Sequence, residues 1–226
     1  SNPDLILTSG KIQTKQLVED GSLNKIPIHV LGSSRSLVKS SKASVLQNKK
    51  CSNFRKALTC LVIPEGIESE IDRLFEFSLQ CALNFPEITF IWRLHPLFSF
   101  EMLYSRNSIY KTLPKNILLS ENELEDDLDS CHWVLYRGSS VVIQAVVAGL
   151  KPIYLNFVGE MSIDPIYQIN SWKNQISNLH EFELTILQNQ GNYYDFLKAK
   201  MYCLNMYSPL NVLLIIDILK KIKQNK

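Results

Sequence analysis

Two short polar segments of the chain hold the side chains that are best suited to chemistry. Each follows an apolar run of strand length and contains a residue that breaks regular structure, Pro96 in one and Gly138 in the other. The segments supply two guanidinium groups, an imidazole, two hydroxyls and a flexible turn: Arg93, His95, Arg137, Gly138, Ser139 and Ser140. Cations, hydroxyls and backbone amides bind phosphate oxygens, so these segments predict a phosphate site.

The second segment opens a helix that we predict over residues 141–148. The first N–H groups of a helix have no partner within it, and they form the positive end of the helix dipole. A phosphate therefore fits at Ser139 and Ser140. Ser139 also has a purely structural interpretation as the helix N-cap, and the two roles are compatible. Gly149 is predicted at the C′ position, before Lys151-Pro152 prevents the helix from continuing.

Strands and helices alternate through the middle of the chain and must position these segments. Each predicted strand is a continuous apolar run, which is typical of parallel strands covered on both faces. The strands are predicted over residues 58–63, 88–94, 117–119, 132–136 and 152–155. The helices are predicted over residues 67–84, 98–110, 121–130, 141–148, 179–188, 192–206 and 210–223. The pattern predicts an α/β fold, a Rossmann-like doubly wound parallel sheet with C-terminal helices.

Ligands of an open parallel sheet bind at the carboxyl ends of its strands. Glu65 and Gly66 follow the first predicted strand, and Glu121 follows the third. We therefore expect them on the same edge of the sheet as His95 and Ser139, where a carboxylate is placed to bind ribose hydroxyls. The whole set suits a nucleoside monophosphate or diphosphate.

Plainer interpretations of three of these residues stay open. Glu65 between proline and glycine fits a solvated turn, and His95 before proline fits a turn histidine. Arg137 has an alternative as an ion-pair partner of the acidic helix at residues 121–130.

The composition excludes several classes of function. The 226 residues are 46% hydrophobic and 20% charged, which is typical of a globular protein, and the net charge of +2 gives no basic field for nucleic acid. The acidic residues 123–129 lack the spacing of a calcium loop, and Cys131-His132 has no partner pair. We therefore expect no metal and no cofactor. The sequence contains neither a P-loop nor a GxGxxG segment after a strand.

The cysteines and the hydropathy pattern bear on the compartment. The five cysteines form no CxxC pair, which predicts reduced thiols in a reducing compartment. No run of 18 uncharged apolar residues predicts a transmembrane helix, and no signal peptide opens the sequence.

The chain divides into four predicted parts. Residues 1–35 are a remnant of a preceding domain or a first strand–helix unit, and residues 36–56, rich in serine and lysine, are a linker. Residues 57–170 form the Rossmann-like domain, and residues 171–226 form helices that pack on it. Since residues 1–35 are too few for a core of their own, we expect the chain to be part of a longer protein.

The order of these motifs resembles that in glycosyltransferases of the two-domain GT-B type. The donor-binding half of that class has a Gly-Ser-Ser turn, an apolar helix and a segment similar to Ala148-Gly149-Leu150-Lys151-Pro152. Arg93-Leu94-His95-Pro96 followed by Ser139-Ser140 is similar to the His-Pro and Ser-Ser pairs of bacterial sialyltransferases and of polyol-phosphate polymerases of wall teichoic acid synthesis. Residues 57–156 also resemble bacterial surface-carbohydrate proteins of the O-antigen and capsule type.

The resemblance implies transfer of a glycosyl group from a nucleotide sugar to a glycan or lipid-linked acceptor. It implies that His95 and Arg93 neutralise the leaving group and that Arg137, Gly138, Ser139 and Ser140 hold the phosphates. Glu65 or Glu121 would meet the ribose, and Gly66 would belong to the same donor-binding site. The resemblance implies a cytoplasmic enzyme. It leaves open whether the missing acceptor domain associates with the inner membrane. The alternatives are a nucleotide-sugar 2-epimerase of the same fold and a non-catalytic carbohydrate-assembly protein.

Overall fold

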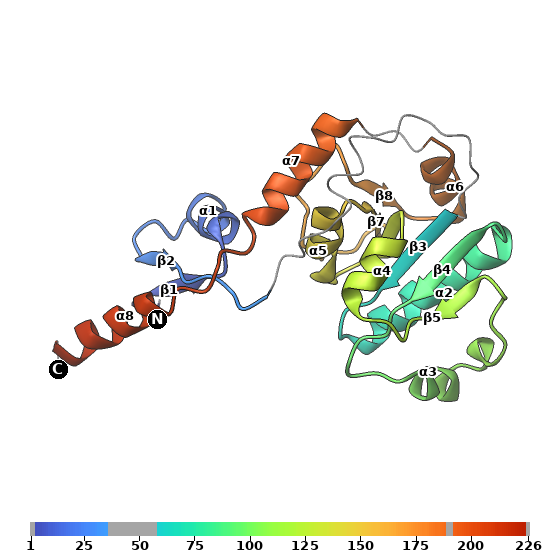
Figure 1. Ribbon diagram of the computed structural model, residues 1–226, viewed down its shortest axis with the longest axis horizontal. Helices are drawn as coiled ribbons and strands as arrows, with labels where there is room; N and C mark the ends of the chain where they lie inside the picture. Colours follow the sequence, from blue (N-terminus) through green and yellow to red (C-terminus); the bar gives the residue numbers. More distant parts are fainter. Residues whose placement is uncertain (1–2, 36–57, 189–191, 225–226) are drawn as a thin grey trace. The chain divides into compact units, whose positions relative to one another are not determined.

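The computed structural model describes residues 3–35, 58–188 and 192–224 (Figure 1). Contacts divide the chain into two compact units, one of Val38–Ala199 and one of Ser1–Leu37 with Lys200–Lys226. The predicted linker at residues 36–56 lies outside the described residues. The division differs from the predicted grouping of residues 171–226, because the part from Lys200 onward belongs with the N-terminal residues.

The larger unit is built on a parallel sheet of six strands. Its strands are β3 Leu58–Ile63, β4 Ile88–Trp92, β5 Ile117–Leu119, β6 Trp133–Tyr136, β7 Lys151–Leu155 and β8 Asn174–Ile176. The order across the sheet is β5-β4-β3-β6-β7-β8, and every neighbouring pair is parallel. The α/β, Rossmann-like, doubly wound architecture is thus confirmed. The sixth strand, β8, was not predicted.

Strand β3 lies at the centre of the sheet and pairs with β4 on one side and β6 on the other. Along the chain, the strand order runs outward from β3 through β4 to β5 and then resumes at β6 in the opposite direction. The carboxyl ends of β3 and β6 therefore flank the point where the order reverses, which is where ligands of such sheets bind.

Helices cover both faces of this sheet (Figure 1). They are α2 Glu68–Asn84, α3 Phe100–Arg106, the 3-10 helix η2 Ser108–Lys111, α4 Leu124–Ser130, α5 Val141–Ala148 and α6 Leu179–Gln188. Helix α7 Tyr193–Leu204 comes next in the chain and continues into the smaller unit. Helix α2 packs with α6, and α4 packs with α5. Six of the eight residues of α5 are buried, as its apolar sequence predicts.

Two helix predictions are wrong in extent. The single helix expected at residues 98–110 is divided at Asn107, whose side chain accepts a hydrogen bond from the Ile109 amide and ends α3. The acidic helix expected from Glu121 begins only at Leu124. Gly149 has the predicted left-handed conformation, with φ 97°, and ends α5.

The core of the larger unit is aromatic around α2 and β4. The rings of Phe75 and Trp92 stack with centroids 4.4 Å apart, and both residues are fully buried. The indole nitrogen of Trp92 donates to the Ser78 hydroxyl at 2.9 Å, so the polar atom of this buried ring is satisfied. These contacts fix α2 on the sheet and thereby fix the loop that joins β3 to α2.

The smaller unit contains a two-stranded parallel sheet and a C-terminal helix. Strands β1 Ile6–Thr8 and β2 Ile28–Val30 are joined through α1 Lys11–Glu19, and α8 spans Val212–Gln224. Gly32, with φ 88°, lies so close to Pro209 that an ideal Cβ on it would be 2.1 Å from the Pro209 carbonyl oxygen. Within the described ranges, no helix is long and apolar enough to cross a membrane.

Candidate functional site

Predicted site residues from three strands meet where the strand order reverses. Glu65 and Gly66 follow β3, His95 follows β4 and Gly138 follows β6. Because β3 lies between β4 and β6, the loop after β3 contacts both neighbouring loops. An ideal Cβ on Gly66 would be 3.0 Å from His95 Cε1, and one on Gly138 would be 2.7 Å from Glu65 Oε2.

The Glu65 carboxylate binds the backbone of the predicted phosphate turn. Its Oε2 accepts a hydrogen bond from the Gly138 amide at 2.5 Å, while its Oε1 is buried and has no hydrogen-bond partner within the described structure. Burial raises the pKa of the Glu65 carboxyl, and the negative charge of Glu70 adds to the rise. Glu65 is therefore a half-buried, partly satisfied acid, and its interpretation as a solvated turn residue is wrong.

His95 combines a turn role with a position in the site. Its Nδ1 accepts from the Leu97 amide at 3.3 Å, and its carbonyl accepts from the Phe98 amide at 2.9 Å. With Nδ1 accepting, the neutral ring carries its proton on Nε2. The ring packs over Gly66, where a larger residue would displace it. The turn role of His95 is thus observed, and its role in binding a phosphate stays a prediction.

The two serines stand where α5 begins. Ser140 rather than Ser139 is the N-cap residue of the helix, and its side chain makes no capping hydrogen bond. Ser139 is buried, with 6% of its surface exposed. The Ser139 carbonyl accepts from the Val142 amide and the Ser140 carbonyl from the Ile143 amide, both at 3.2 Å, and these bonds form the first turn of α5.

Arg93 is held by a buried carboxylate. Its Nη1 donates to Asp127 Oδ2 at 2.8 Å and to the Asn122 carbonyl at 2.7 Å. Asp127 is fully buried in α4 and also accepts from the Ser120 hydroxyl. The charge of Arg93 is therefore compensated within the protein, and its first role is to satisfy Asp127.

Arg137 is buried on the side of α2. It donates to Glu70 through Nε, to Glu160 Oε2 at 2.5 Å through Nη2, and to the Leu155 carbonyl at 3.3 Å. Its guanidinium lies over the Phe157 ring, 4.6 Å from the centroid. The interpretation that Arg137 pairs with the acidic helix is wrong, since the described contact of that helix with a guanidinium comes from Arg93.

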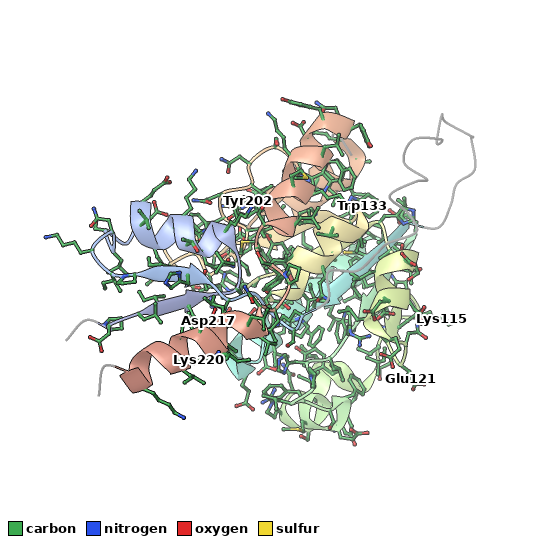
Figure 2. All side chains as sticks on the ribbon, turned by 60° about the vertical axis from the view of Figure 1, so that its left-hand side comes forward. Lys115, Glu121, Trp133, Tyr202, Asp217 and Lys220 are labelled. Atoms are coloured by element: carbon green, nitrogen blue, oxygen red, sulfur yellow. The ribbon has the colours of Figure 1, made fainter. Side chains whose placement is uncertain are left out.

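Glu121 lies apart from the other predicted residues. It is exposed in the loop after β5, at the outer edge of the sheet domain (Figure 2). Strand β5 is three strands from β6, which corresponds to about 14 Å. Of the two predicted ribose-binding carboxylates, Glu65 is therefore the one at the reversal point.

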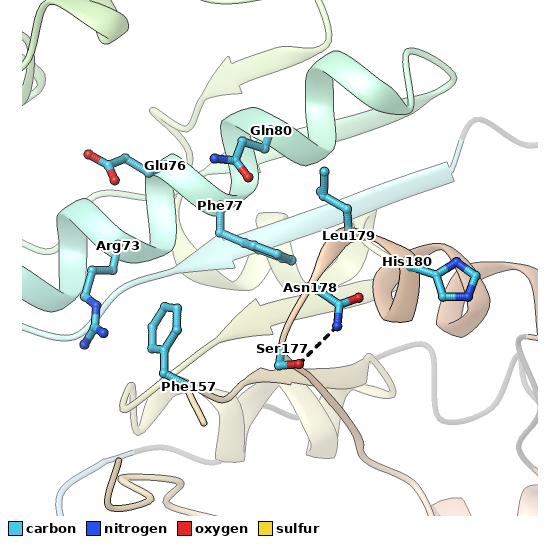
Figure 3. A pocket seen from close by; sticks show the side chains of 9 residues that line it. All are labelled: Arg73, Glu76, Phe77, Gln80, Phe157, Ser177, Asn178, Leu179 and His180. Carbon is cyan, nitrogen blue, oxygen red and sulfur yellow. Dashed lines mark hydrogen bonds between the residues drawn. The ribbon is translucent and has the colours of Figure 1, made fainter. Parts of the chain in front are cut away.

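A cavity that the sequence did not predict lies between α2 and the segments that follow β7 and β8 (Figure 3). Its volume is about 630 Å³. It is lined by four residues on one face of α2 and by residues after the two strands: Arg73, Glu76, Phe77, Gln80, Phe157, Ser177, Asn178, Leu179 and His180. None of these was among the predicted site residues. The only signal in the sequence is the helical spacing of the α2 residues, which by itself indicates no ligand.

The reversal point brings together three groups. They are the Gly138 amide bound to a carboxylate oxygen, the N-terminus of α5, and the His95 imidazole, whose Nδ1 accepts a hydrogen bond. Within residues 3–35, 58–188 and 192–224, no group of three His, Cys, Asp or Glu side chains has the arrangement of a metal site.

Solved structures with the same fold include glycosyltransferases and a putative epimerase. The chain matches the glycotransferase of kitacinnamycin with a TM-score of 0.58 and 8% identity, over 97% of this chain and 55% of that one. It matches the pneumococcal O-GlcNAc transferase GtfA, solved with UDP and GlcNAc, with a TM-score of 0.54 and 15% identity, over 98% and 44%. The fold is that of one half of a GT-B glycosyltransferase.

The same fold also serves a second activity. A putative UDP-N-acetylglucosamine 2-epimerase from Listeria monocytogenes matches with a TM-score of 0.52 and 13% identity, over 91% of this chain and 55% of that one. The chain spans about half the length of these solved structures. Neither a protein-family model nor the sequence of a curated protein matches the chain.

Proposed function

We propose that the reversal point between β3 and β6 binds the phosphates of a nucleotide sugar, and that the chain is the donor-binding half of a glycosyltransferase. The observation that carries the proposal is the hydrogen bond from the Gly138 amide to Glu65 Oε2. In this bond the Gly138 amide, which precedes α5, already donates to a negatively charged oxygen. A phosphate oxygen can take the same place. The fold supports the same edge of the sheet as the ligand site.

Binding of a phosphate requires an exchange at Gly138. A phosphate oxygen takes the amide hydrogen that Glu65 accepts in this structure, and the Glu65 carboxylate then turns to a hydroxyl of the ribose. Glu65 Oε1 is buried and accepts no hydrogen bond within the described structure. This unpaired oxygen makes the present position of the Glu65 carboxyl less favourable and so favours the exchange. Glu121 has no part in this arrangement.

His95, the serines and α5 provide the charge stabilisation. The Nε2–H group of His95 donates to a phosphate oxygen, and the positive end of α5 with the Ser139 and Ser140 groups faces the others. As the glycosidic bond breaks, negative charge grows on the departing phosphate, and these donors stabilise it without reorganising. We propose that no metal takes part. Arg93 acts as a positioning residue, since its guanidinium is already bound to Asp127.

The acceptor and the rest of the chemistry belong to a further domain. The chain spans about half the length of the transferases that share its fold, so the acceptor-binding groups are expected outside it. We propose that the acceptor is a glycan or lipid-linked precursor of a bacterial surface polysaccharide, as the His-Pro and Ser-Ser motifs imply. The neighbour structures with UDP make UDP the first probe to use.

Calorimetry tests the proposal. We expect the chain to bind UDP and at least one of UDP-, GDP-, CDP- or CMP-linked sugars, with affinity reduced about tenfold by His95→Ala. His29→Ala is the matched control, because His29 is an exposed histidine on β2, outside the reversal point and outside the cavity beside α2. Absence of binding to every nucleotide favours a non-catalytic protein, and 2-epimerisation of the sugar by the longer protein favours the epimerase alternative.

A further inference from the structure

The cavity beside α2 has the lining of a ligand site and is separate from the reversal point. Phe77 and Phe157 form its apolar wall, with Leu179 facing them across the opening (Figure 3). The amides of Gln80 and Asn178 stand at its rim. An apolar interior with a few polar groups at the edge is the usual composition of a small-molecule pocket.

The polar rim is held in place by the start of α6. Asn178 Oδ1 accepts from the Glu181 amide at 2.9 Å, and the Glu181 carboxylate accepts from the Ser177 amide at 2.6 Å. Asn178 Nδ2 donates to the Ser177 hydroxyl at 3.2 Å. These bonds cap α6 and fix the orientation of the Asn178 side chain, so the rim is preorganised.

Two guanidinium groups lie over the Phe157 ring of the cavity: that of Arg73, which lines the cavity, and that of Arg137, which is buried behind the lining. Arg73 lies over Phe157 at 4.0 Å and Arg137 at 4.6 Å from the ring centroid. Both bind the same carboxylate: Glu160 Oε1 is 2.5 Å from Arg73 Nη2, and Glu160 Oε2 is 2.5 Å from Arg137 Nη2. Glu70, a residue of α2, forms ion pairs with both Arg73 and Arg137.

Of the two carboxylates in this cluster, Glu160 is the one placed to leave. The side chain of Glu70 is 16% exposed, whereas that of Glu160 is 38% exposed and comes from the loop after β7. Arg73, which is 37% exposed, and the buried Arg137 are the cations that remain. The neighbouring Gly159 has φ 85° and no atom within 4 Å of an ideal Cβ, so the loop has room to move there. Departure of Glu160 leaves one uncompensated positive charge at the end of an open cavity.

We propose that this cavity binds a sugar ring that carries an acidic group, with the acid replacing the Glu160 carboxylate on Arg73 and Arg137. The ring then lies against Phe157 and Phe77, and its hydroxyls meet the Gln80 and Asn178 amides. The exchange of the Glu160 carboxylate for the carboxylate of a ligand keeps the charge of the cluster unchanged, so it adds no new buried charge. A phosphate monoester in the same place adds up to about one further negative charge. Glu160 acts as an internal competitor for the ligand. The proposal is independent of the proposed function.

Calorimetry of the full chain with glucose 6-phosphate, glucuronic acid and glucose tests it. We expect at least one of the two acids to bind and glucose not to bind. Glu160→Gln removes the competing charge and should tighten binding about fivefold, while Arg73→Gln should abolish it. Arg106→Gln is the matched control: it removes the same charge from α3, where Arg106 binds Glu68 and Asp72.

Each outcome decides the proposal. If glucose 6-phosphate alone binds, the acidic group of the ligand is a phosphate. If glucuronic acid alone binds, it is a carboxylate. Either result supports the site. Failure of both acids to bind Glu160→Gln, verified as folded by circular dichroism, overturns it. So does an equal loss of binding in Arg73→Gln and Arg106→Gln, since that would reflect net charge alone. UDP titrated into the same variants tests the reversal point separately.

Discussion

Glu65 Oε2 lies 2.5 Å from the amide nitrogen of Gly138, and this hydrogen bond joins the end of β3 to the end of β6. The two residues are 73 positions apart in the sequence and meet because their strands are neighbours in register, Ile63 beside Tyr136. The contact brings an acid and the turn before α5 into one site. It also makes Gly138 a residue that no side chain can replace without movement.

Gly138→Ala is expected to lower stability and to weaken UDP binding. Its Cβ would be 2.7 Å from Glu65 Oε2 and 3.0 Å from Ile163 Cδ1, which is too close for either atom to stay in place. We expect a loss of about 1–3 kcal/mol in the free energy of unfolding, measured by urea denaturation. In the double variant Glu65→Ala/Gly138→Ala the carboxylate is absent, so the added cost of the alanine should shrink. An undiminished cost would contradict the contact.

Glu65→Gln is expected to change how stability depends on pH. Burial raises the pKa of the Glu65 carboxyl above its ordinary value of 4.5, so the folded state holds the proton more tightly than the unfolded state. The stability from this group is full below pH 4.5 and is lost as the pH rises through the raised pKa. Glutamine stays neutral and can still accept from Gly138.

The measurement for Glu65→Gln is the urea midpoint at pH 4 and at pH 7. At each pH the stability of the unaltered protein is subtracted from that of the variant. This difference should be more favourable to the variant at pH 7 than at pH 4. Glu121→Gln removes the same charge at an exposed position and serves as the control. The same difference from the unaltered protein at both pH values would rule out a raised pKa at Glu65.

The ion pair of Arg93 and Asp127 should respond unequally to loss of its two members. Arg93→Ala leaves the fully buried Asp127 carboxylate without its cation, which costs about 3–5 kcal/mol. Asp127→Asn leaves Arg93, which is 28% exposed and can turn to water, and costs about 1 kcal/mol. Chemical denaturation of both variants and of the double variant measures the asymmetry. Equal costs would contradict the asymmetry, because the buried Asp127 carboxylate would then depend on Arg93 no more than Arg93 depends on it.

The strands that the sequence predicts best are those whose residues are all apolar. Leu58–Ile63 is observed as predicted because its continuous apolar run has one interpretation, a strand buried on both faces. Asn174–Ile176 escaped prediction because only Ile176 is buried in it, and two polar residues of an edge strand give no pattern. The segments after β3, β4 and β6 lie at the carboxyl edge, as predicted, because the strands before them were predicted.

Side-chain partners were predicted less well than positions. Arg93 and Arg137 were both placed at the carboxyl edge, but the acidic helix binds Arg93 and not Arg137. The face of the sheet to which an arginine side chain points depends on the pleat of the strand. Its partner depends on the helix that covers that face. The sequence of a single strand shows neither. The cavity beside α2 was missed because its walls come from residues 73–80, 157 and 177–180, which only the assembled sheet brings together.

The end of α5 was predicted from the rule that a glycine in the left-handed conformation ends a helix, and Gly149 allows a test of that rule. Its φ of 97° and ψ of 9° lie in the left-handed region, and its amide donates to the Ala145 and Val146 carbonyls at the end of the helix. Alanine at this position carries the steric cost of a Cβ beside the following carbonyl, about 1–2 kcal/mol. Asparagine tolerates the left-handed conformation better, so Gly149→Asn should cost less than Gly149→Ala.

Thermal and urea unfolding of the two Gly149 variants provide the comparison. A left-handed glycine predicts the order glycine, asparagine, alanine in decreasing stability. If asparagine and alanine cost the same amount, the cost comes from lost space rather than from the backbone conformation. Since α5 starts at the turn that binds Glu65, a shift of its C-terminal end should also reach Gly138, and UDP affinity should fall in the same order as stability.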